Sequence, residues 1–316
     1  MNEVPLVSVI MPAYNSSAYI EASIQSVLDQ DYEAIELIVV DDGSSDGTPE
    51  LARAFGSRVQ VIEQKNSGPA AARNKGVSAA RGELLAFVDA DDIWLPGKAR
   101  AQVRYLTEHP DIGIVFGRWI RWDANPDGSF SAPPAVVEDN AGCPVIPQLS
   151  GWSYPELLLD SVVWIVSSML RKPIWETLGG LDTTLRVGED YDFFLRASRI
   201  SKIDKLNQTV AYYRIHQQST THVMRPEDYE TRVIERALND FGTKGPDGRP
   251  VATDLLNDRL FELNFNHGYR HFYSGNPRIA VDAFKKARRY CHKRAWKASV
   301  YLRLSQLKSW LYSDRH

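Results

Sequence analysis

The first ninety residues alternate between two kinds of sequence periodicity, and this alternation restricts the fold more than any other feature of the chain. Four short runs are apolar and rich in β-branched residues, as buried parallel strands are: LVSVIM (6–11), IELIVV (35–40), RVQVIE (58–63) and ELLAFVD (83–89). Between them lie three stretches with helical character: 19–30, 48–55 and 67–82. Strands and helices in this order predict right-handed βαβ units and an α/β fold built on a parallel sheet.

Polar residues follow each of these four strands. The segments are Pro12–Asn15, Asp41–Gly43, Gln64–Asn66 and Asp89–Asp91. In a parallel sheet the carboxyl ends of the strands lie along one edge, which is where open α/β sheets bind ligands. Asp92 extends the last segment, and neighbouring carboxylates repel one another unless a cation lies between them. We therefore expect a cation-dependent ligand site at this edge of the sheet.

The common glycine-rich phosphate-binding loops are absent, which limits how this edge can bind a phosphate. A dinucleotide fold needs G-x-G-x-x-G after its first strand, but the first glycine of the chain is Gly43, and no Walker loop occurs. The calcium-like run DGSSDG has Arg53 at its twelfth position instead of Glu. Mg²⁺ or Mn²⁺ can instead bridge carboxylates to diphosphate oxygens. Asp89-Ala90-Asp91, an Asp-x-Asp at a strand end, fits that role.

The remainder of the chain divides into a mixed part and a helical part. In the mixed part the periodicity predicts helices at 98–109 and 189–200, strands at 112–122, 161–172 and 210–216, and a loop at 123–151. From Pro226 onward only helices are expected. Residues 259–296 are similar to one helical hairpin of the tetratricopeptide type, with Gly268 and Gly275 near the expected places. We predict two domains, 1–224 and 225–316.

Composition places the chain among ordinary soluble proteins. Hydrophobic residues make up 43% and charged residues 24%, and no apolar run approaches the roughly 20 residues of a membrane span. The first residues lack a basic, apolar leader, so we expect no signal peptide. Cys143 and Cys291 match no metal or redox spacing and suggest a reducing compartment. A cytoplasmic location is therefore expected.

The charge of the chain is unevenly distributed. From Arg278 to the end, 11 Lys/Arg stand against 2 Asp/Glu, although the whole chain has a net charge of −3. Between Lys285 and Arg315 these basic residues mix with tyrosine and tryptophan, as they do in interfacial helices. This pattern predicts a peripheral contact with an anionic membrane surface. Packing of the same residues against the main domain is the alternative.

Three longer stretches resemble the family-two glycosyltransferases of the GT-A fold. They are VSVIMPAYNSSAYIEASIQSVLDQDYEAIELIVVDDGSSDGT, NSGPAAARNKGVSAARGELLAFVDADD and GGLDTTLRVGEDYDFFLRA. The resemblance spans about residues 5–220 and implies a Rossmann-like, mainly parallel sheet with helices on both faces, followed by an all-helical C-terminal appendage. It also implies that the protein transfers a sugar from a nucleotide-diphosphate sugar with inversion at the anomeric carbon. The chain lacks the Q-x-x-R-W of the membrane-embedded polymerases, so processive synthesis is not expected.

The resemblance also implies residues that bind the nucleotide. Pro12, Ala13 and Tyr14 correspond to the segment that binds the base. Asp42 corresponds to the acceptor of the pyrimidine N–H, which suggests a UDP or dTDP donor. Arg73 corresponds to a nucleotide or phosphate contact.

The remaining matched positions carry the chemistry of transfer. Asp91 corresponds to the metal ligand of the Asp-x-Asp, with Mn²⁺ or Mg²⁺ as the cofactor, and Asp89 faces the donor sugar or ribose. His216, in YRIH, corresponds to a histidine that closes on the diphosphate and metal. Asp190, in GED, corresponds to the catalytic base. Residues 111–168 match nothing specific, so the acceptor is open: a glycan or lipid-linked acceptor in surface polysaccharide or glycoconjugate assembly is expected, and no nucleic acid.

Two other functions are compatible with parts of this pattern. A sugar-phosphate nucleotidyltransferase also places carboxylates and Mg²⁺ on an α/β edge, but it would need a glycine-rich, basic loop where Pro12–Asn15 lies. A non-catalytic sugar- or lipid-binding relative is the other alternative. Taken singly, the residues also have ordinary structural interpretations. Asp42 suits a turn, Arg73 suits a solvated helix, and Asp190 suits the positive end of a helix dipole.

Overall fold

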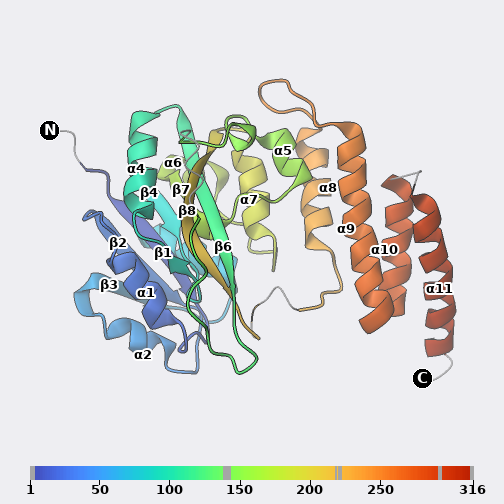
Figure 1. Cartoon of the computed structure of the whole chain (residues 1–316), viewed down its shortest axis with the longest axis horizontal. Helices are drawn as coiled ribbons and strands as arrows, with labels where there is room; N and C mark the ends of the chain where they lie inside the picture. The colour runs from blue at the N-terminus through green and yellow to red at the C-terminus, as the bar shows by residue number, and fades with distance from the viewer. Residues whose placement is uncertain (1–3, 138–143, 218, 220–222, 291–293, 314–316) are drawn as a thin grey trace. The chain divides into compact units, whose positions relative to one another are not determined.

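The computed structural model describes residues 4–137, 144–217, 219, 223–290 and 294–313 (Figure 1). The chain forms two compact units. The first unit comprises Met1–Tyr154 with Ser161–Gln217, and the second comprises Pro155–Asp160 with Gln218–His316. The predicted domain boundary after residue 224 remains a prediction. Cys143 and Cys291, on which the expectation of a reducing compartment rests, lie outside the described residues.

The first unit is built on an eight-stranded sheet with the order β3-β2-β1-β4-β7-β6-β8-β5. The strands are β1 Val7–Ala13, β2 Ile35–Asp41, β3 Val59–Glu63, β4 Leu84–Phe87, β5 Ile93–Trp94, β6 Ile112–Asp123, β7 Ser168–Arg171 and β8 Lys202–Ile215. The half made of β1 to β4 is parallel, as the sequence predicts. In the other half β7 is antiparallel to both β4 and β6, β8 is parallel to β6, and β5 is antiparallel to β8.

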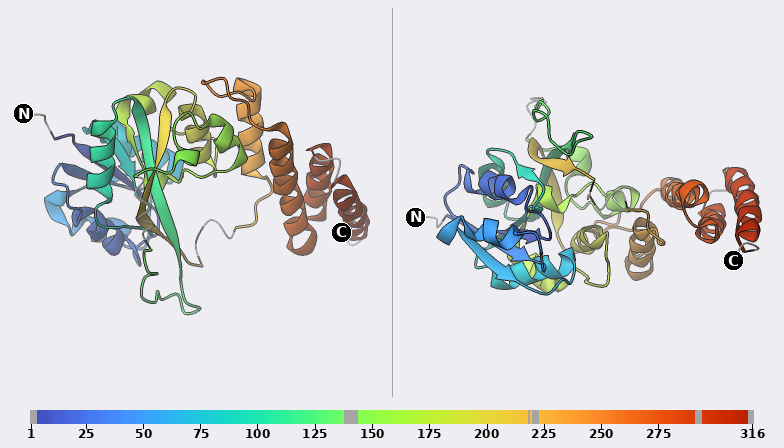
Figure 2. Two further views of the ribbon diagram at one scale, coloured as in Figure 1. Left: turned by 45° about the horizontal axis from the view of Figure 1, so that its top comes forward. Right: turned by 90° about the horizontal axis from the view of Figure 1, so that it is seen from below.

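Helices cover both faces of this sheet (Figure 2). Those of the first unit are α1 Ile20–Leu28, α2 Thr48–Arg53, α3 Pro69–Ala79, α4 Lys98–Glu108, α6 Lys172–Leu178 and α7 Glu189–Ala197. Three 3₁₀ turns, Gly56–Arg58, Pro147–Leu149 and Ile165–Ser167, connect them.

Successive side chains of β1 point to opposite faces of the sheet. Val9 and Met11 are fully buried in a core that they share with Ile24 of α1. Ile10 points the other way, toward α3: a Cβ atom added to Gly76 would lie 2.5 Å from Ile10 Cγ2. Because side chains alternate between the faces of a strand, α1 and α3 lie on opposite sides of the sheet. The absence of a side chain at Gly76 allows the close approach of α3.

The structure corrects two predicted strands. Residues 161–172 are not one strand, because Ile165–Ser167 forms a 3₁₀ turn and only β7 is extended. The hydroxyls of Ser167 and Ser168 donate to the carbonyls of Trp164 and Ile165, and such local bonds favour a turn over a ladder. β8 begins at Lys202, well before the predicted start at residue 210.

In the second unit the regular elements among the described residues are helices, with one isolated bridge between Lys244 and Pro250. α5 Tyr154–Leu159 belongs to this unit from Pro155 onward, and four longer helices follow. They are α8 Tyr229–Phe241, α9 Thr253–Ser274, α10 Pro277–Tyr290 and α11 Ala295–Ser313. α9 and α10 pack closely at Gly268, where an added Cβ atom would lie 3.0–3.1 Å from the Phe284 ring. The core of the unit also holds Ala280, Ala287, Ala298 and Leu302. Among the described residues no helix has the length and apolar character to cross a membrane.

Candidate active site

The segments that follow β1, β2 and β4 meet at one edge of the sheet. Ala13 pairs with Asp41, and the backbone N–H of Asp42 donates to the Ala13 carbonyl at 2.8 Å. Ile10 pairs with Phe87 on the other side, so the chain that continues to Asp89 leaves the sheet at the same edge. The structure thus brings the sequence-predicted residues of three strands to a common edge.

Three carboxylates cluster there. One oxygen from each of Asp89, Asp91 and Asp92 lies within 4.8 Å of the others. The side chains of Asp89 and Asp91 are 28% and 32% exposed, whereas Asp92 is fully buried. Burial and the charges of Asp91 and Asp89 raise the pKa of Asp92 well above its usual value. Oxygen ligands at this spacing suit a hard divalent cation, whose charge would stabilise the ionised form of all three.

Arg73 connects this cluster to a distant part of the chain. Its Nη2 atom lies 2.5 Å from Asp89 Oδ1, and its Nη1 atom lies 2.8 Å from Glu189 Oε1 at the start of α7. Burial alone would lower the pKa of Arg73, but Asp89 and Glu189 raise it above its usual value. Arg73 is 5% exposed, so the interpretation as a solvated helical residue is wrong. Its cation instead holds the start of α7 beside the acidic cluster.

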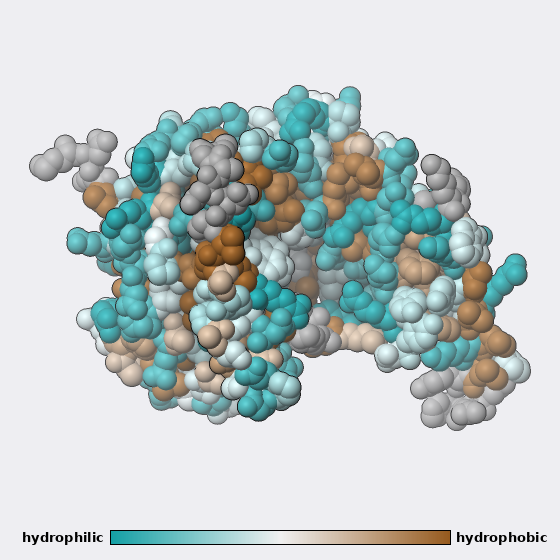
Figure 3. Space-filling model, viewed as in Figure 1, coloured by the Kyte–Doolittle hydropathy of each residue, from teal (hydrophilic) through white to brown (hydrophobic). Residues whose placement is uncertain are grey.

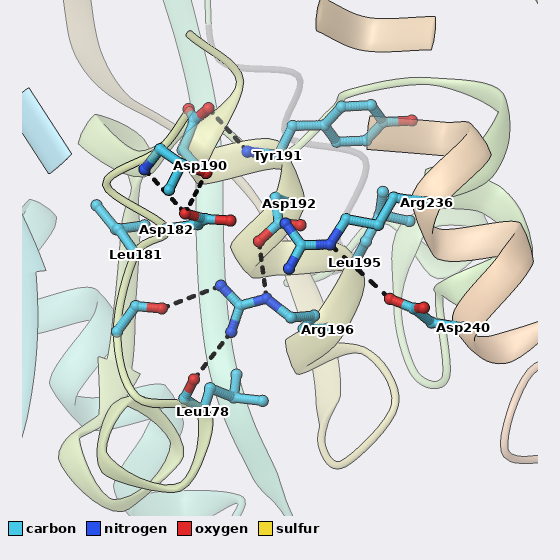
Figure 4. A network of polar contacts seen from close by, with 12 residues as sticks. Leu178, Leu181, Asp182, Asp190, Tyr191, Asp192, Leu195, Arg196, Arg236 and Asp240 are labelled. Atoms are coloured by element: carbon cyan, nitrogen blue, oxygen red, sulfur yellow. Dashed lines mark hydrogen bonds and ion pairs between the residues drawn. The ribbon is translucent and has the colours of Figure 1, made fainter. Parts of the chain in front are cut away.

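Asp190 follows Glu189 on α7 and is partly exposed. Gly188 precedes the helix with a φ of 79°, a left-handed conformation that turns the chain sharply into α7. Asp190 Oδ1 accepts a hydrogen bond from the Tyr191 N–H at 2.8 Å (Figure 4). Burial, aided by the charge of Glu189, raises the pKa of Asp190 to about 7. A carboxylate with this pKa is suited to take up a proton near neutral pH.

Asp192 is distinct from Asp190, although only one residue separates them. It is 4% exposed, and its Oδ2 atom lies 2.7 Å from Arg196 Nε (Figure 4). Arg196 also donates to the carbonyls of Leu178 and Gly180, both at 3.0 Å. Asp192 therefore fixes the loop between α6 and α7 through Arg196.

His216 lies against the acidic cluster. Its Nε2 atom is 3.0 Å from Asp91 Oδ2, and its ring stacks on Tyr19 at a centroid distance of 4.4 Å. The residue is 8% exposed. Asp91 and His216 are thus adjacent, as expected of two residues that contact the same ion and diphosphate.

Comparison with known proteins shows the family of this chain. Residues 8–131 match the family described as glycosyl transferase family 2. A glycosyltransferase of Nostoc sp., named as uncharacterized, is 30% identical over 266 residues, which are 82% of this chain and 77% of that protein. The chain belongs to glycosyl transferase family 2. This confirms the resemblance drawn from the sequence motifs, and with it the prediction that the protein is a glycosyltransferase.

Other family 2 relatives and solved structures extend the comparison. The hyaluronan synthase of Pasteurella multocida is 27% identical over 252 residues, which are 77% of this chain and 24% of that protein. The crystal structure of S. aureus TarS 1-349 in complex with UDP-GlcNAc has a TM-score of 0.68 and 18% identity, and covers 96% of this chain and 88% of that one. The mannosyltransferase PcManGT from Pyrobaculum calidifontis, in complex with GDP-Man and Mn²⁺, has a TM-score of 0.62 and 19% identity over 98% and 88%. These likenesses confirm the predicted GT-A fold.

The nucleotide-binding residues predicted for this glycosyltransferase lie beside the cluster. Pro12 and Ala13 end β1, and Tyr14 is 52% exposed at the same edge. Asp42 is 4% exposed and accepts three hydrogen bonds of 2.8 Å, from Gln64 Nε2 and from two backbone N–H groups of the loop before α3. Asp42 therefore organises that loop, and a carboxylate with two oxygens still has room for one further donor.

Sequence reasoning placed Asp92 in the expected cation site but missed Arg214, which bonds to it. Arg214 is 6% exposed; its guanidinium donates to the carbonyl of Asp91 and, at 2.9 Å, to Ser23 Oγ. Asp92 Oδ1 accepts the Arg214 N–H at 2.9 Å, while no described residue bonds to Asp92 Oδ2. The pair holds the Asp-x-Asp loop against α1 and β8. The adjacency of Asp92 to Asp91 was the available signal, whereas nothing in the YRIH motif by itself indicates the contacts of Arg214.

Proposed function

We propose that this glycosyltransferase moves a sugar from a UDP- or dTDP-sugar to a hydroxyl of a glycan or lipid-linked acceptor, with inversion and with Mg²⁺ or Mn²⁺. The observation that carries the proposal is the bridge through Arg73. It places the three-carboxylate cluster and the start of α7 on either side of one guanidinium, 2.5 Å from Asp89 and 2.8 Å from Glu189. A cation site and a base are the two parts that inverting transfer needs.

The proposed roles fall into two groups: residues that hold the cation at the leaving diphosphate, and the base at the acceptor hydroxyl. Asp91, with Asp89, Asp92 and His216 around it, would hold the cation, which offsets negative charge on the leaving diphosphate. Asp190 would accept the proton of the acceptor hydroxyl as its oxygen attacks the anomeric carbon. A single base fits inversion, because the acceptor attacks opposite the leaving group. The Mn²⁺ bound by PcManGT supports a divalent cation for this fold.

A group of aromatic side chains supports a glycan as the acceptor. Trp119, Trp164 and Tyr213 are partly exposed, with ring centroids 4.1 to 5.7 Å apart. β7 begins at Ser168, and its next residue pairs with Ala86 near the carboxyl end of β4, so the chain before Ser168 lies beyond that end. Aromatic faces pack against the C–H faces of sugar rings. The relation to a hyaluronan synthase supports a role in polysaccharide or glycoconjugate assembly.

We expect UDP- and dTDP-sugars to stabilise the protein in the presence of Mn²⁺. A ligand at about 100 times its Kd stabilises the folded state by about 2.7 kcal/mol, which raises the Tm by several degrees. The measurement is a thermal-unfolding panel of nucleotide sugars with Mn²⁺ and with EDTA. ADP-sugars serve as the control and should shift the Tm little. Stabilised samples are then assayed for donor hydrolysis: binding without hydrolysis would favour the non-catalytic relative, and formation of nucleotide sugar from a nucleoside triphosphate would favour the nucleotidyltransferase.

The base contact predicted for Asp42 has its own test. Asp42→Ala should weaken UDP binding by one charge-assisted hydrogen bond, about 1.5–3 kcal/mol, because the carboxylate accepts from the uracil N3–H. CDP provides the matched control, since cytosine carries no proton at N3, and it separates the base contact from disruption of the loop that Asp42 organises. Calorimetry should show that the preference of the wild type for UDP over CDP disappears in the variant. An equal loss of affinity for both nucleotides would assign Asp42 a structural role only.

A further inference from the structure

α11 of the second unit is apolar on two sides. Ala298 and Leu302 face inward and pack in the core with Phe261 and Phe284. The other side carries large apolar residues that are 45–64% exposed: Trp296, Val300, Leu304, Leu307, Trp310 and Leu311. We call these six residues the α11 stripe. Their spacing of three and four residues puts them on one face of the helix. The hydrophobic surface along α11 is visible in Figure 3.

The α11 stripe is unusual for a soluble protein surface. Single exposed apolar residues are ordinary, but a contiguous row of six, with a tryptophan near each end, marks a contact surface. Tryptophan is enriched where an apolar phase meets water.

Positive charge flanks the α11 stripe. At 100° per residue, Lys297 and Lys308 lie along one border of the row, and Arg303 lies within it, between Trp310 and Trp296. The Lys308 ammonium also donates to the carbonyl of Phe272. The chain contains no Asp or Glu between Asp282 and Asp314. The exposed residues of α10 add further basic groups, including Arg288 and Arg289. A partner of this surface must therefore supply both an apolar phase and negative charge.

We infer that α11 lies in the interface of an anionic membrane, with its stripe among the upper acyl chains and the cationic groups of Lys297 and Arg303 at the headgroups. Long cationic side chains beside an apolar row can extend to phosphate groups in this geometry. Binding parallel to the surface is consistent with the absence, among the described helices, of a segment able to cross a membrane.

A second copy of the chain fits this surface less well. Two α11 stripes placed face to face by a two-fold axis would bring Lys297 and Arg303 of both copies together. The stretch from residue 283 to 313 has no carboxylate to offset that repulsion. Charge complementarity thus selects the membrane. The inference is independent of the proposed sugar transfer, because the candidate active site belongs to the first unit.

The test uses the full chain and vesicles of defined composition. We expect the protein to float with phosphatidylcholine vesicles that contain about 30% phosphatidylglycerol, and to remain in solution with pure phosphatidylcholine. Binding should weaken in 0.5 M salt, because the Debye length there falls to only a few ångströms, roughly half its physiological value. Leu304→Glu/Leu307→Glu should reduce vesicle binding at least tenfold. The matched control is Leu255→Glu, which changes a leucine of α9 that is 56% exposed and lies outside the stripe.

Further measurements separate loss of the surface from loss of the fold. Circular dichroism and donor hydrolysis without vesicles should be unchanged in the double variant. If that variant unfolds, Trp296→Ser/Trp310→Ser replaces it, since both side chains are at least 60% exposed. The inference is overturned if the wild type does not float with anionic vesicles, or if the stripe variants float as well as Leu255→Glu. A dimer in light scattering that the stripe variants abolish, without vesicle binding, would assign the stripe to a second copy.

Discussion

Asp190→Asn is expected to lower kcat by a factor of about 10²–10⁴ while donor affinity stays near the wild-type value. An acceptor hydroxyl is a weak nucleophile at neutral pH, so its proton must move to a base as the new bond forms. The amide of asparagine keeps the size of the carboxylate, and its oxygen can still accept the Tyr191 N–H, but it has no basicity. The measurement is the rate of nucleoside diphosphate release at saturating donor, together with calorimetry of donor binding.

The pH dependence provides a second readout of the same residue. The base works only when it is ionised, and the pKa of Asp190 is raised to about 7. The ionised fraction is therefore about one tenth at pH 6 and about nine tenths at pH 8. We expect the kcat of the wild type to rise through this range and the residual rate of Asp190→Asn to lack the rise.

Asp192→Asn is the matched control on the same helix turn. Its carboxylate bonds to Arg196 and is 4% exposed, so the change should lower the Tm but leave the acidic limb of the pH profile in place. A folded Asp190→Asn enzyme that transfers sugar at the wild-type rate would show that Asp190 is structural. In that case Glu189, already bonded to Arg73, would be the next carboxylate to test.

The parallel half of the fold could be predicted from sequence because three of its strands, β1, β2 and β4, are buried on both faces along most of their length, whereas the edge strand β3 exposes Gln60 and Glu63. Such strands are apolar throughout, and this pattern needs no knowledge of distant residues. The first half of β8 carries no such pattern. Asp204 lies within it and is 7% exposed, and its carboxylate accepts from Tyr105 Oη at 2.6 Å and from the Gly151 N–H at 2.8 Å. An aspartate in the sequence favours the prediction of a loop, because the distant residues that satisfy its carboxylate in a buried strand are not known from the sequence.

The same limit applies to the candidate site. Asp42 and the Asp-x-Asp could be predicted as site residues because they follow β2 and β4 in the sequence. In a parallel sheet, the residues that follow the strands lie at the carboxyl edge, where ligands bind. The contact of Arg73 with Glu189 joins residues 116 positions apart, and Arg214 reaches Ser23 across 191 positions. No local spacing encodes such pairs. Resemblance to the family identified Arg73 and Asp89 but indicated neither the ion pair between them nor the contact of Arg73 with Glu189.

Asp91→Ala is expected to abolish metal-dependent donor binding. The other two carboxylates of the cluster are held by the protein: Asp89 Oδ1 lies 2.5 Å from Arg73 Nη2, and Asp92 Oδ1 accepts the Arg214 N–H. The side chain of Asp91 is 32% exposed, and its contact within the described residues is with His216, so it is the carboxylate most able to turn toward an ion. Loss of a residue that merely supports a metal ligand costs about 10–100-fold in affinity or activity. Removal of the principal ligand should cost at least the upper end of that range.

The Asp91→Ala experiment is decisive because the difference in donor affinity between the wild type and the variant should depend on Mn²⁺. Calorimetry with a UDP-sugar and Mn²⁺ should show tight binding by the wild type and weak binding by the variant. With EDTA in place of Mn²⁺ the two proteins should bind the nucleotide equally, because the base contacts that we predict for Tyr14 and Asp42 would not involve the ion. A variant that is weaker by the same factor in EDTA would have lost the shape of the loop instead of a metal ligand. Wild-type turnover that continues undiminished in excess EDTA would show that the acidic cluster acts without a cation, and the leaving diphosphate would then need another source of positive charge, for which Arg73 is the nearest candidate.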